Sequence, residues 1–206
     1  MRTAWASASL AAAVAALGAM VLVSGCRVSS DKHGDGDNVK ISTPFGGMQV
    51  KTDNASVLNE IGLPVYPGAA LVQDDKNKSS ADVNLSFGSF HLKVNAVSYR
   101  TSDAPDMVTA FYRKALEKYG DVIQCHGNKT IGTPERTSEG LTCDDNGGGH
   151  VSVSDEGSGK IELKTGSKQR QHIVEINPEG AGTKFGLVAL ELPDHVSVGS
   201  HNGDKQ

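Results

Sequence analysis

The sequence predicts an α+β fold, a mainly antiparallel sheet with one principal amphipathic helix packed on one face. Two observations lead to this prediction. Apolar and polar residues alternate over most of the chain beyond residue 38, as in half-buried strands, whereas residues 104–119 have apolar residues at helical spacing. After a leader at residues 1–25, the 206-residue chain has room for one ordinary domain, which we place at residues 39–192.

Residues 1–25 have the order of a secretory leader. Arg2 is followed by an apolar stretch over residues 10–23, and then by Ser24 and Gly25, the small residues of a cleavage point. The alternative is a transmembrane signal anchor, for which this Ala-rich stretch is short. We therefore expect a signal peptide.

The end of this leader, Val23-Ser24-Gly25-Cys26, resembles the lipobox of bacterial lipoproteins. The resemblance implies that the Cys26 thiol receives a diacylglycerol group, that the leader is cut before Cys26, and that the new N-terminus is acylated, for example by palmitate. Each buried CH₂ contributes about 0.8 kcal/mol, so two or three chains would anchor the protein to a membrane. An Asp after the cysteine favours the inner membrane in this family. Arg27 therefore favours the outer membrane, facing the periplasm, if the source is Gram-negative.

We expect residues 26–38 to form a flexible tether. Val28 is the one apolar residue between positions 27 and 38, so the segment buries too little to offset the entropy of ordering it. A calcium site is the alternative, but the acidic residues lack the spacing and the closing Glu of a calcium loop. These residues are Asp31, Asp35 and Asp37.

The next three segments approach the main domain. Residues 39–52 alternate as two strands joined by a turn at Phe45-Gly46-Gly47. Residues 53–62 give a weaker pattern, a helical turn or a loop. Residues 63–69 contain two prolines, which remove backbone donors and restrict the residues before them, and so predict a rigid extended entry.

A meander of two or three strands is expected over residues 83–99. Its apolar residues change from even to odd positions between Asn95 and Val97, which predicts a bulge or a bend. The alternating apolar residues are Val83, Leu85 and Phe87, then Phe90, Leu92 and Val94, then Val97 and Tyr99.

The principal helix is expected from about Ala104 to Tyr119. Ser102 or Asp103 would provide its N-cap, and Gly120 would end it. Its apolar stripe should lie across the sheet, and the spacing of its tyrosines favours core packing over ligand stacking. The stripe comprises Val108, Phe111, Tyr112, Ala115, Leu116 and Tyr119.

Beyond Gly120 only strand patterns occur, which predicts an antiparallel sheet for the second half of the chain. Residues 193–206 have few apolar residues and are expected to form a disordered tail. The predicted strands are residues 122–125, 141–143, 150–154, 160–164, 172–177 and 183–192.

Two motifs in this domain resemble those of a loose group of bacterial exported proteins. One is L-P-x-Y-P-G-A at residues 63–69, and the other is F-Y-x-x-x-L at residues 111–116. The resemblance covers residues 39–192. It implies a lipoprotein or periplasmic domain, and it supplies no catalytic residues.

Cys125 and Cys143 remain as a pair once Cys26 is assigned to lipid. In an exported chain such a pair predicts a disulfide, which would stabilise the fold by about 3 kcal/mol. The alternative is zinc bound with His126 and His150, but the spacing matches no common ligand pattern.

The charge and the motifs limit the function. Removing Arg2 with the leader leaves 19 Lys and Arg against 24 Asp and Glu, a net charge of −5, which disfavours nucleic acid as a partner. Nucleotide-binding loops and the hydrolase nucleophile elbow do not match, so no catalytic residue, cofactor or metal site is assigned. We expect a non-enzymatic envelope lipoprotein that binds an unknown envelope protein or ligand. The alternative is an envelope hydrolase whose catalytic residues are distant in sequence.

Overall fold

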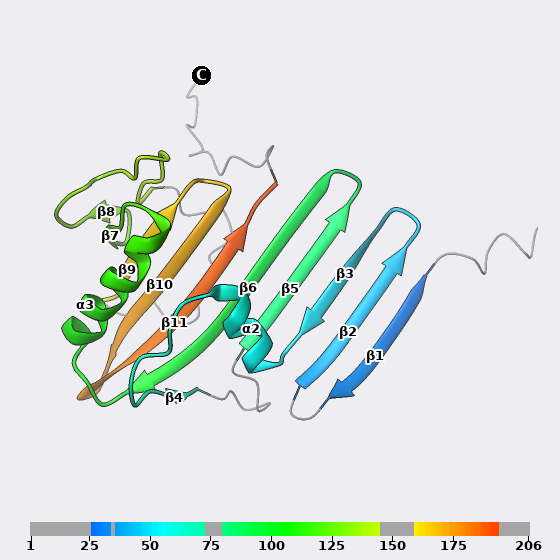
Figure 1. Cartoon of the computed structure of the whole chain (residues 1–206), viewed down its shortest axis with the longest axis horizontal. Coiled ribbons are helices and arrows are strands. Elements are labelled where there is room, and N and C mark those ends of the chain that lie inside the picture. Colours follow the sequence, from blue (N-terminus) through cyan, green and yellow to red (C-terminus); the bar gives the residue numbers. More distant parts are fainter. Residues whose placement is uncertain (1–25, 34–35, 73–79, 145–158, 194–206) are drawn as a thin grey trace, which may run out of the picture.

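The fold is one long antiparallel sheet. A computed structural model describes residues 26–33, 36–72, 80–144 and 159–193. Its sheet has 11 strands in the order β1-β2-β3-β5-β6-β11-β10-β9-β7-β8, with β4 beside β6 (Figure 1). The strands are β1 Arg27–His33, β2 Gly36–Thr43, β3 Gly46–Lys51, β4 Ala70–Leu71, β5 Ser80–Phe87, β6 Phe90–Thr101, β7 Ile123–His126, β8 Lys129–Thr130, β9 Ile161–Gly166, β10 Arg170–Glu179 and β11 Gly182–Glu191.

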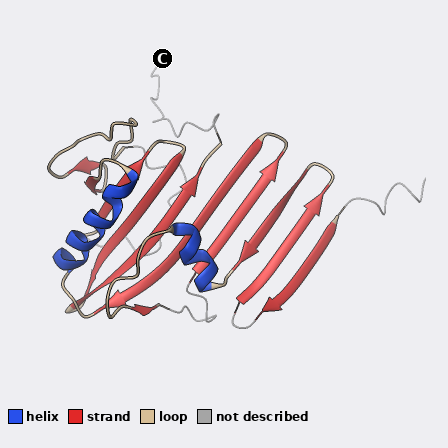
Figure 2. Cartoon of the chain, in the orientation of Figure 1, coloured by secondary structure: helices blue, strands red, loops and turns tan. Residues whose placement is uncertain are grey.

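The predicted α+β class is wrong, because the fold is essentially a β-sheet. Strands and bridges account for 54% of the described residues and helices for 16% (Figure 2). The helices are α2 Asn54–Ile61, α3 Pro105–Leu116 and the 3₁₀ turn η1 Glu117–Tyr119. Both α-helices are short and lie on one face of the sheet, and α3 covers only its β9–β11 region. No single helix therefore forms a second layer.

Local sequence explains where each helix begins and ends. The Asp53 side chain accepts a hydrogen bond from the Ser56 backbone N–H at the start of α2, and Gly62 ends this helix with φ 68°. Helix α3 begins with Pro105 and has no side-chain cap. The predicted cap Asp103 accepts a hydrogen bond from the Tyr66 hydroxyl instead, at 2.7 Å.

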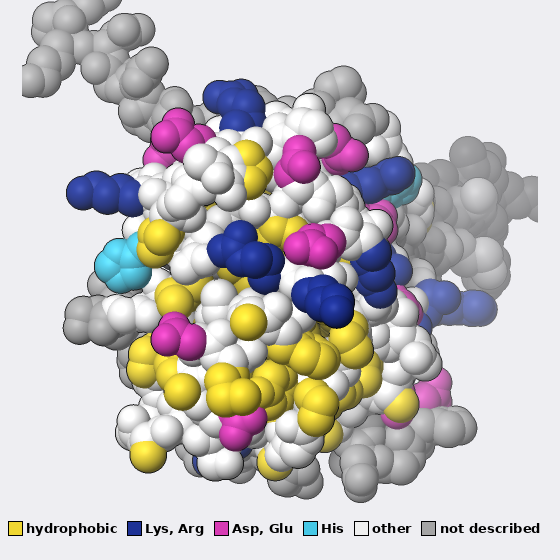
Figure 3. Space-filling view, turned by 60° about the vertical axis from the view of Figure 1, so that its left-hand side comes forward, with side chains coloured by type: hydrophobic (Ala, Val, Ile, Leu, Met, Phe, Trp, Pro, Cys, Tyr) yellow, Lys and Arg dark blue, Asp and Glu magenta, His cyan; other side chains and the backbone are white. Residues whose placement is uncertain are grey.

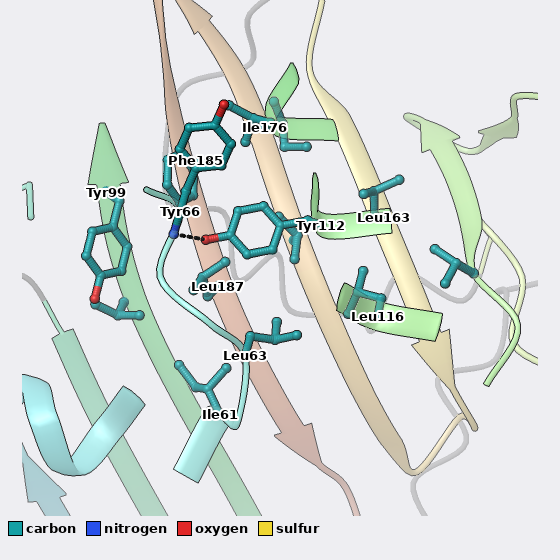
Figure 4. Close-up of a cluster of buried hydrophobic side chains, with 14 of the residues drawn as sticks. Ile61, Leu63, Tyr66, Tyr99, Tyr112, Leu116, Leu163, Ile176, Phe185 and Leu187 are labelled. Atoms are coloured by element: carbon teal, nitrogen blue, oxygen red, sulfur yellow. Dashed lines mark hydrogen bonds between the residues drawn. The ribbon is translucent and has the colours of Figure 1, made fainter. Parts of the chain in front are cut away.

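The main core lies between the helices and the neighbouring strands β6, β11, β10 and β9. Tyr112 of α3 is fully buried, and its hydroxyl accepts a hydrogen bond from the Tyr66 N–H at 3.1 Å and donates one to the Pro64 carbonyl at 3.2 Å (Figure 4). Each large apolar side chain buried here contributes about 1.5–3 kcal/mol. Core residues include Val57, Ile61, Leu63, Val97, Tyr99, Val108, Leu116, Leu163, Val174, Ile176, Phe185 and Leu187.

The structure differs from the expected tether at residues 26–38. Arg27–His33 forms β1, and β2 begins at Gly36, with Arg27 opposite Ser42 and His33 opposite Gly36. The segment is polar but pairs through backbone hydrogen bonds, which need no apolar side chains. An extra hairpin thereby extends the sheet before residue 39.

Two further strand predictions need correction. Strand β6 runs from Phe90 to Thr101 and pairs in unbroken register with β5 and β11, so the bulge that was predicted as one of two alternatives, beside a bend, is absent. Residues 141–143 form no strand and contribute only the isolated bridge between Arg136 and Thr142. The predicted strand at 150–154, the leader, and residues 194–206 of the predicted tail lie outside the described residues.

Candidate functional site

The sheet has a second apolar surface, on the face that points away from the helices. On β6, Val97 and Tyr99 belong to the core under the helices, so Leu92 and Val94, at even positions, point to the opposite face. Directly paired residues of antiparallel strands share a face. One row therefore runs Val39, Val50, Val83, Val94 and Leu190, and a second runs Val28, Ile41, Met48, Leu85 and Leu92.

We call this surface, on β2, β3, β5 and β6, the apolar face. Met48 is 38% exposed and Phe87 is 48% exposed. Most of its other side chains are partly exposed. No helix or strand in the described part of the chain lies over it, because both α-helices lie on the other side of the sheet (Figure 1).

The reverse side of the same strands is polar. Directly behind the two apolar rows lies a row that consists of Lys40, Gln49, Asn84 and Lys93. An antiparallel sheet with one solvated face normally buries the other. Of the two sides of these strands, the apolar face is therefore the one whose burial would be favourable.

Cys26, the predicted lipidation site, is exposed and directly precedes β1. Because Arg27 pairs with Ser42, Cys26 lies level with Thr43 at the end of β2. Its position is therefore one strand away from the apolar face. No described residues separate it from the sheet as a spacer would.

The predicted disulfide between Cys125 and Cys143 is present, with Cα atoms 5.6 Å apart. The two residues are buried in a small cluster with Ile123 and Leu141, which pins the segment after β7 to the sheet. These thiols are therefore not free to bind zinc. His126 is exposed at the end of β7, and His150 lies outside the described residues.

The helix side of the sheet carries an ion-pair cluster beneath α2. Lys93 Nζ lies 2.7 Å from Glu60 Oε2, and Lys51 Nζ lies 3.6 Å from Asp82 Oδ2. The hydrogen bond with Lys93 lowers the pKa of Glu60, whereas burial raises the pKa of Asp82. Asn95 also donates to Glu60, at 3.3 Å. The Lys93–Glu60 pair thus links α2 to β6, whereas the Lys51–Asp82 pair links β3 to β5.

A charged groove runs between α3 and the segments beside it, which include Gln124 of β7 and Ile161 of β9. Two adjoining hollows of about 480 and 530 Å³ share Arg113 and Glu117. Their linings hold side chains of both signs, and Figure 3 shows this mixture on the side of the molecule that carries α3. Arg113 donates to the side chain of Gln124, so part of this surface is already committed to internal contacts.

The described residues provide neither a metal site nor a membrane-spanning helix. They contain no group of three or more His, Cys, Asp or Glu side chains that could hold a metal ion. In the same part of the chain, no helix is long and apolar enough to cross a membrane.

Comparison with known proteins adds no assignment. No protein-family model, curated protein or solved structure matches the chain. The fold and the site define an antiparallel sheet protein with one helix-covered face and one apolar face.

Sequence reasoning missed the apolar face, although its signal was visible. Leu92 and Val94 fall in a predicted strand, but their change of parity relative to Val97 and Tyr99 predicts a bulge or a bend and not a second apolar surface. An unbroken strand with the same pattern presents apolar residues to both faces of the sheet, at different points along its length.

Proposed function

We propose that this chain is a lipid-anchored protein of the cell envelope that binds the hydrocarbon part of an amphiphilic molecule on its apolar face. The observation that supports this most strongly is the pair of apolar rows across β2, β3, β5 and β6, with a polar row behind them. Burying such a surface is favourable by about 25 cal/mol per Å².

The chemistry of the face favours hydrocarbon over a polar partner. Its two central rows contain only Val, Ile, Leu and Met side chains, which neither donate nor accept hydrogen bonds. A polar ligand would lose its bonds to water here and gain none in return. An alkyl chain has no such bonds to lose.

The anchor and the disulfide support placement in the envelope. The lipobox resemblance at Val23-Ser24-Gly25-Cys26 predicts diacylglycerol on Cys26. The bond between Cys125 and Cys143 is of the kind that persists in oxidising compartments. We propose the outer membrane, facing the periplasm, for a Gram-negative source, because Arg27 follows the cysteine.

The hydrolase alternative has one observation in its favour, the raised pKa of the buried Asp82 beside Glu60. A glycosidase would need two carboxyl groups that are both free to reach the substrate. Here Lys51 pairs with Asp82 and Lys93 pairs with Glu60, and the grooves along α3 are lined by other residues. The binding function is therefore the better supported of the two.

The binding proposal is tested with residues 26–206 and the fluorescent probe N-phenyl-1-naphthylamine, displaced by palmitate. Leu85→Gln, on the apolar face, should weaken probe binding about tenfold, as expected for the loss of one well-buried apolar contact. Asn84→Gln, the next residue on the opposite face, is the matched control and should bind like the wild type.

Three outcomes would overturn the proposal. They are the absence of probe binding, equal binding by both variants, and sedimentation as a dimer that buries the apolar face against a second copy. The anchor is tested separately in cells. Cys26→Ser should abolish labelling by radioactive palmitate and release the protein to the soluble fraction, and membrane attachment of this variant would refute the lipid anchor.

A further inference from the structure

One end of the sheet brings Cys26 and two hairpin turns together. Cys26 lies level with Thr43, Thr43 pairs with Gly46, and Gly46 pairs with Phe87. In Figure 1 the chain enters β1 at the end of the sheet where the β2–β3 and β5–β6 turns lie. Three strand spacings separate β1 from β5, so Cys26 and Phe87 are about 14 Å apart along this end.

Exposed aromatic rings stand at both turns. Phe45, in the β2–β3 turn, is 83% exposed, and Phe87, at the end of β5, is 48% exposed. Phe90 pairs with Phe87 across the β5–β6 turn. The Phe87 ring lies against the backbone of Gly46, where an added Cβ would be 2.7 Å from its Cδ1 atom. Exposure of such large apolar side chains indicates an interaction surface.

The ends of the two hairpins that carry these rings lack Asp, Glu, Lys and Arg. Neither residues 41–50 nor residues 83–92 contain Asp, Glu, Lys or Arg, although 21% of the chain is charged. The β9–β10 turn, by contrast, includes Lys168 and leads into Arg170. Entry into a low-dielectric layer is costly for charged groups, so the two uncharged turns are the ones suited to it.

We propose that these turns, residues 43–46 and 87–90, enter the interfacial layer of the phospholipid bilayer that holds Cys26. We call them the tip surface. The inference rests on the proposed function, because it takes Cys26 as the lipid attachment point. Aromatic rings favour the boundary between headgroups and acyl chains. Arg27, next to the anchor and exposed, is placed to meet anionic headgroups.

This orientation joins the apolar face to the membrane. Phe87 and Phe90 lie on the same face as Leu85 and Leu92, one row further along the strands. A hydrocarbon chain leaving the bilayer at the tip surface would therefore meet Leu85 and Leu92 next. The strands stand upright on the membrane, and helix α3 begins at the end of β6 far from it.

The test uses the single free thiol of the mature chain. With Cys125 and Cys143 bonded, Cys26 alone couples to a maleimide-bearing phospholipid in phosphatidylcholine and phosphatidylglycerol vesicles. Residues 26–206 contain no tryptophan, since Trp5 belongs to the leader. The variants Phe45→Trp, Phe87→Trp and Met107→Trp therefore carry one fluorescent probe each. Met107 is 60% exposed near the start of α3, away from the tip surface, and is the control.

We expect Phe45→Trp and Phe87→Trp to shift emission to shorter wavelength on coupling and to lose intensity when the lipid carries brominated acyl chains. Met107→Trp should show neither effect. Equal signals from all three variants, or no change at the two turns, would overturn the proposal. Far-ultraviolet circular dichroism confirms that each variant is folded. Because the lipid is coupled chemically, this result does not depend on lipidation in cells or on ligand binding. Failure of the lipid anchor would be seen with Cys26→Ser in cells, and failure of ligand binding would be seen with the fluorescent probe.

Discussion

The hydroxyl of Tyr112 offers a direct test of how the core is held together. The side chain is fully buried, and its oxygen joins the Tyr66 N–H to the Pro64 carbonyl at 3.1 and 3.2 Å. Tyr112→Phe keeps the ring and removes only this link. The buried Tyr66 N–H then lacks its partner, which costs about 1–3 kcal/mol of unfolding free energy.

Tyr119→Phe is the matched control on the same helical segment. Its hydroxyl donates to the Gly62 carbonyl at 3.1 Å, at an exposed site. Lys118 donates to the same carbonyl at 2.6 Å, so Gly62 keeps a partner in the variant. We expect a loss of less than about 1 kcal/mol here, because water and lysine replace the hydroxyl.

The assay is guanidinium chloride unfolding of residues 26–206, followed by far-ultraviolet circular dichroism at pH 7. The midpoint should fall while the slope stays unchanged. Burial also raises the pKa of Tyr112, so above the unfolded pKa of about 10 the wild type should lose stability that Tyr112→Phe keeps. A loss below about 0.5 kcal/mol at pH 7, or one no larger than that of Tyr119→Phe, would refute the reasoning.

Three further predictions concern the disulfide and two buried groups. Replacing Cys125 and Cys143 by Ser, which opens a link across 18 positions, should cost about 3 kcal/mol in denaturant unfolding, and an unchanged midpoint would contradict it. Burial raises the pKa of Asp82, so the folded state holds the proton of this carboxyl more tightly than the unfolded state does. The stability of the wild type should therefore fall as the pH rises above about 4. Thermal melts from about pH 4 to 7 should show this loss in the wild type and not in Asp82→Asn. Burial lowers the pKa of His172, so stability should fall as pH drops below about 6.5, and His172→Gln should flatten that dependence; identical profiles would argue against it.

Local patterns predicted much of the fold because they act over a few residues. Helix α3 and the bond between Cys125 and Cys143 follow from spacing and composition, and the structure confirms them. The predicted hairpin of residues 39–52 is also present, but its turn is Pro44-Phe45, and Gly46 and Gly47 already belong to β3. Strand β1 could not be predicted this way. Its side chains are polar, and its order comes from backbone pairing with β2, which sequence composition does not report.

The fold class was wrong for a related reason. The apolar stripe of α3 is clear, and it predicts one principal helix lying across the sheet. Helix α3 packs on β9, β10 and β11. It does not cover β1, β2, β3 and β5. The length of a helix limits what it can cover, and 12 residues span about 18 Å. The ten strands that lie side by side, at about 4.8 Å spacing, make a sheet more than twice as wide.

Strand β6 is the point where the two halves of the sheet meet. Its last residues, with Val97 and Tyr99, turn apolar side chains toward the helices, whereas its first residues, with Leu92 and Val94, turn them the other way. Because side chains alternate along a strand, this change needs no bulge, only a change in which positions are apolar. One half of the sheet thus buries its apolar side within the chain, and the other half presents it outward. A surface of this kind is costly in water, so its presence next to the predicted anchor is itself the reason to expect that hydrocarbon covers it.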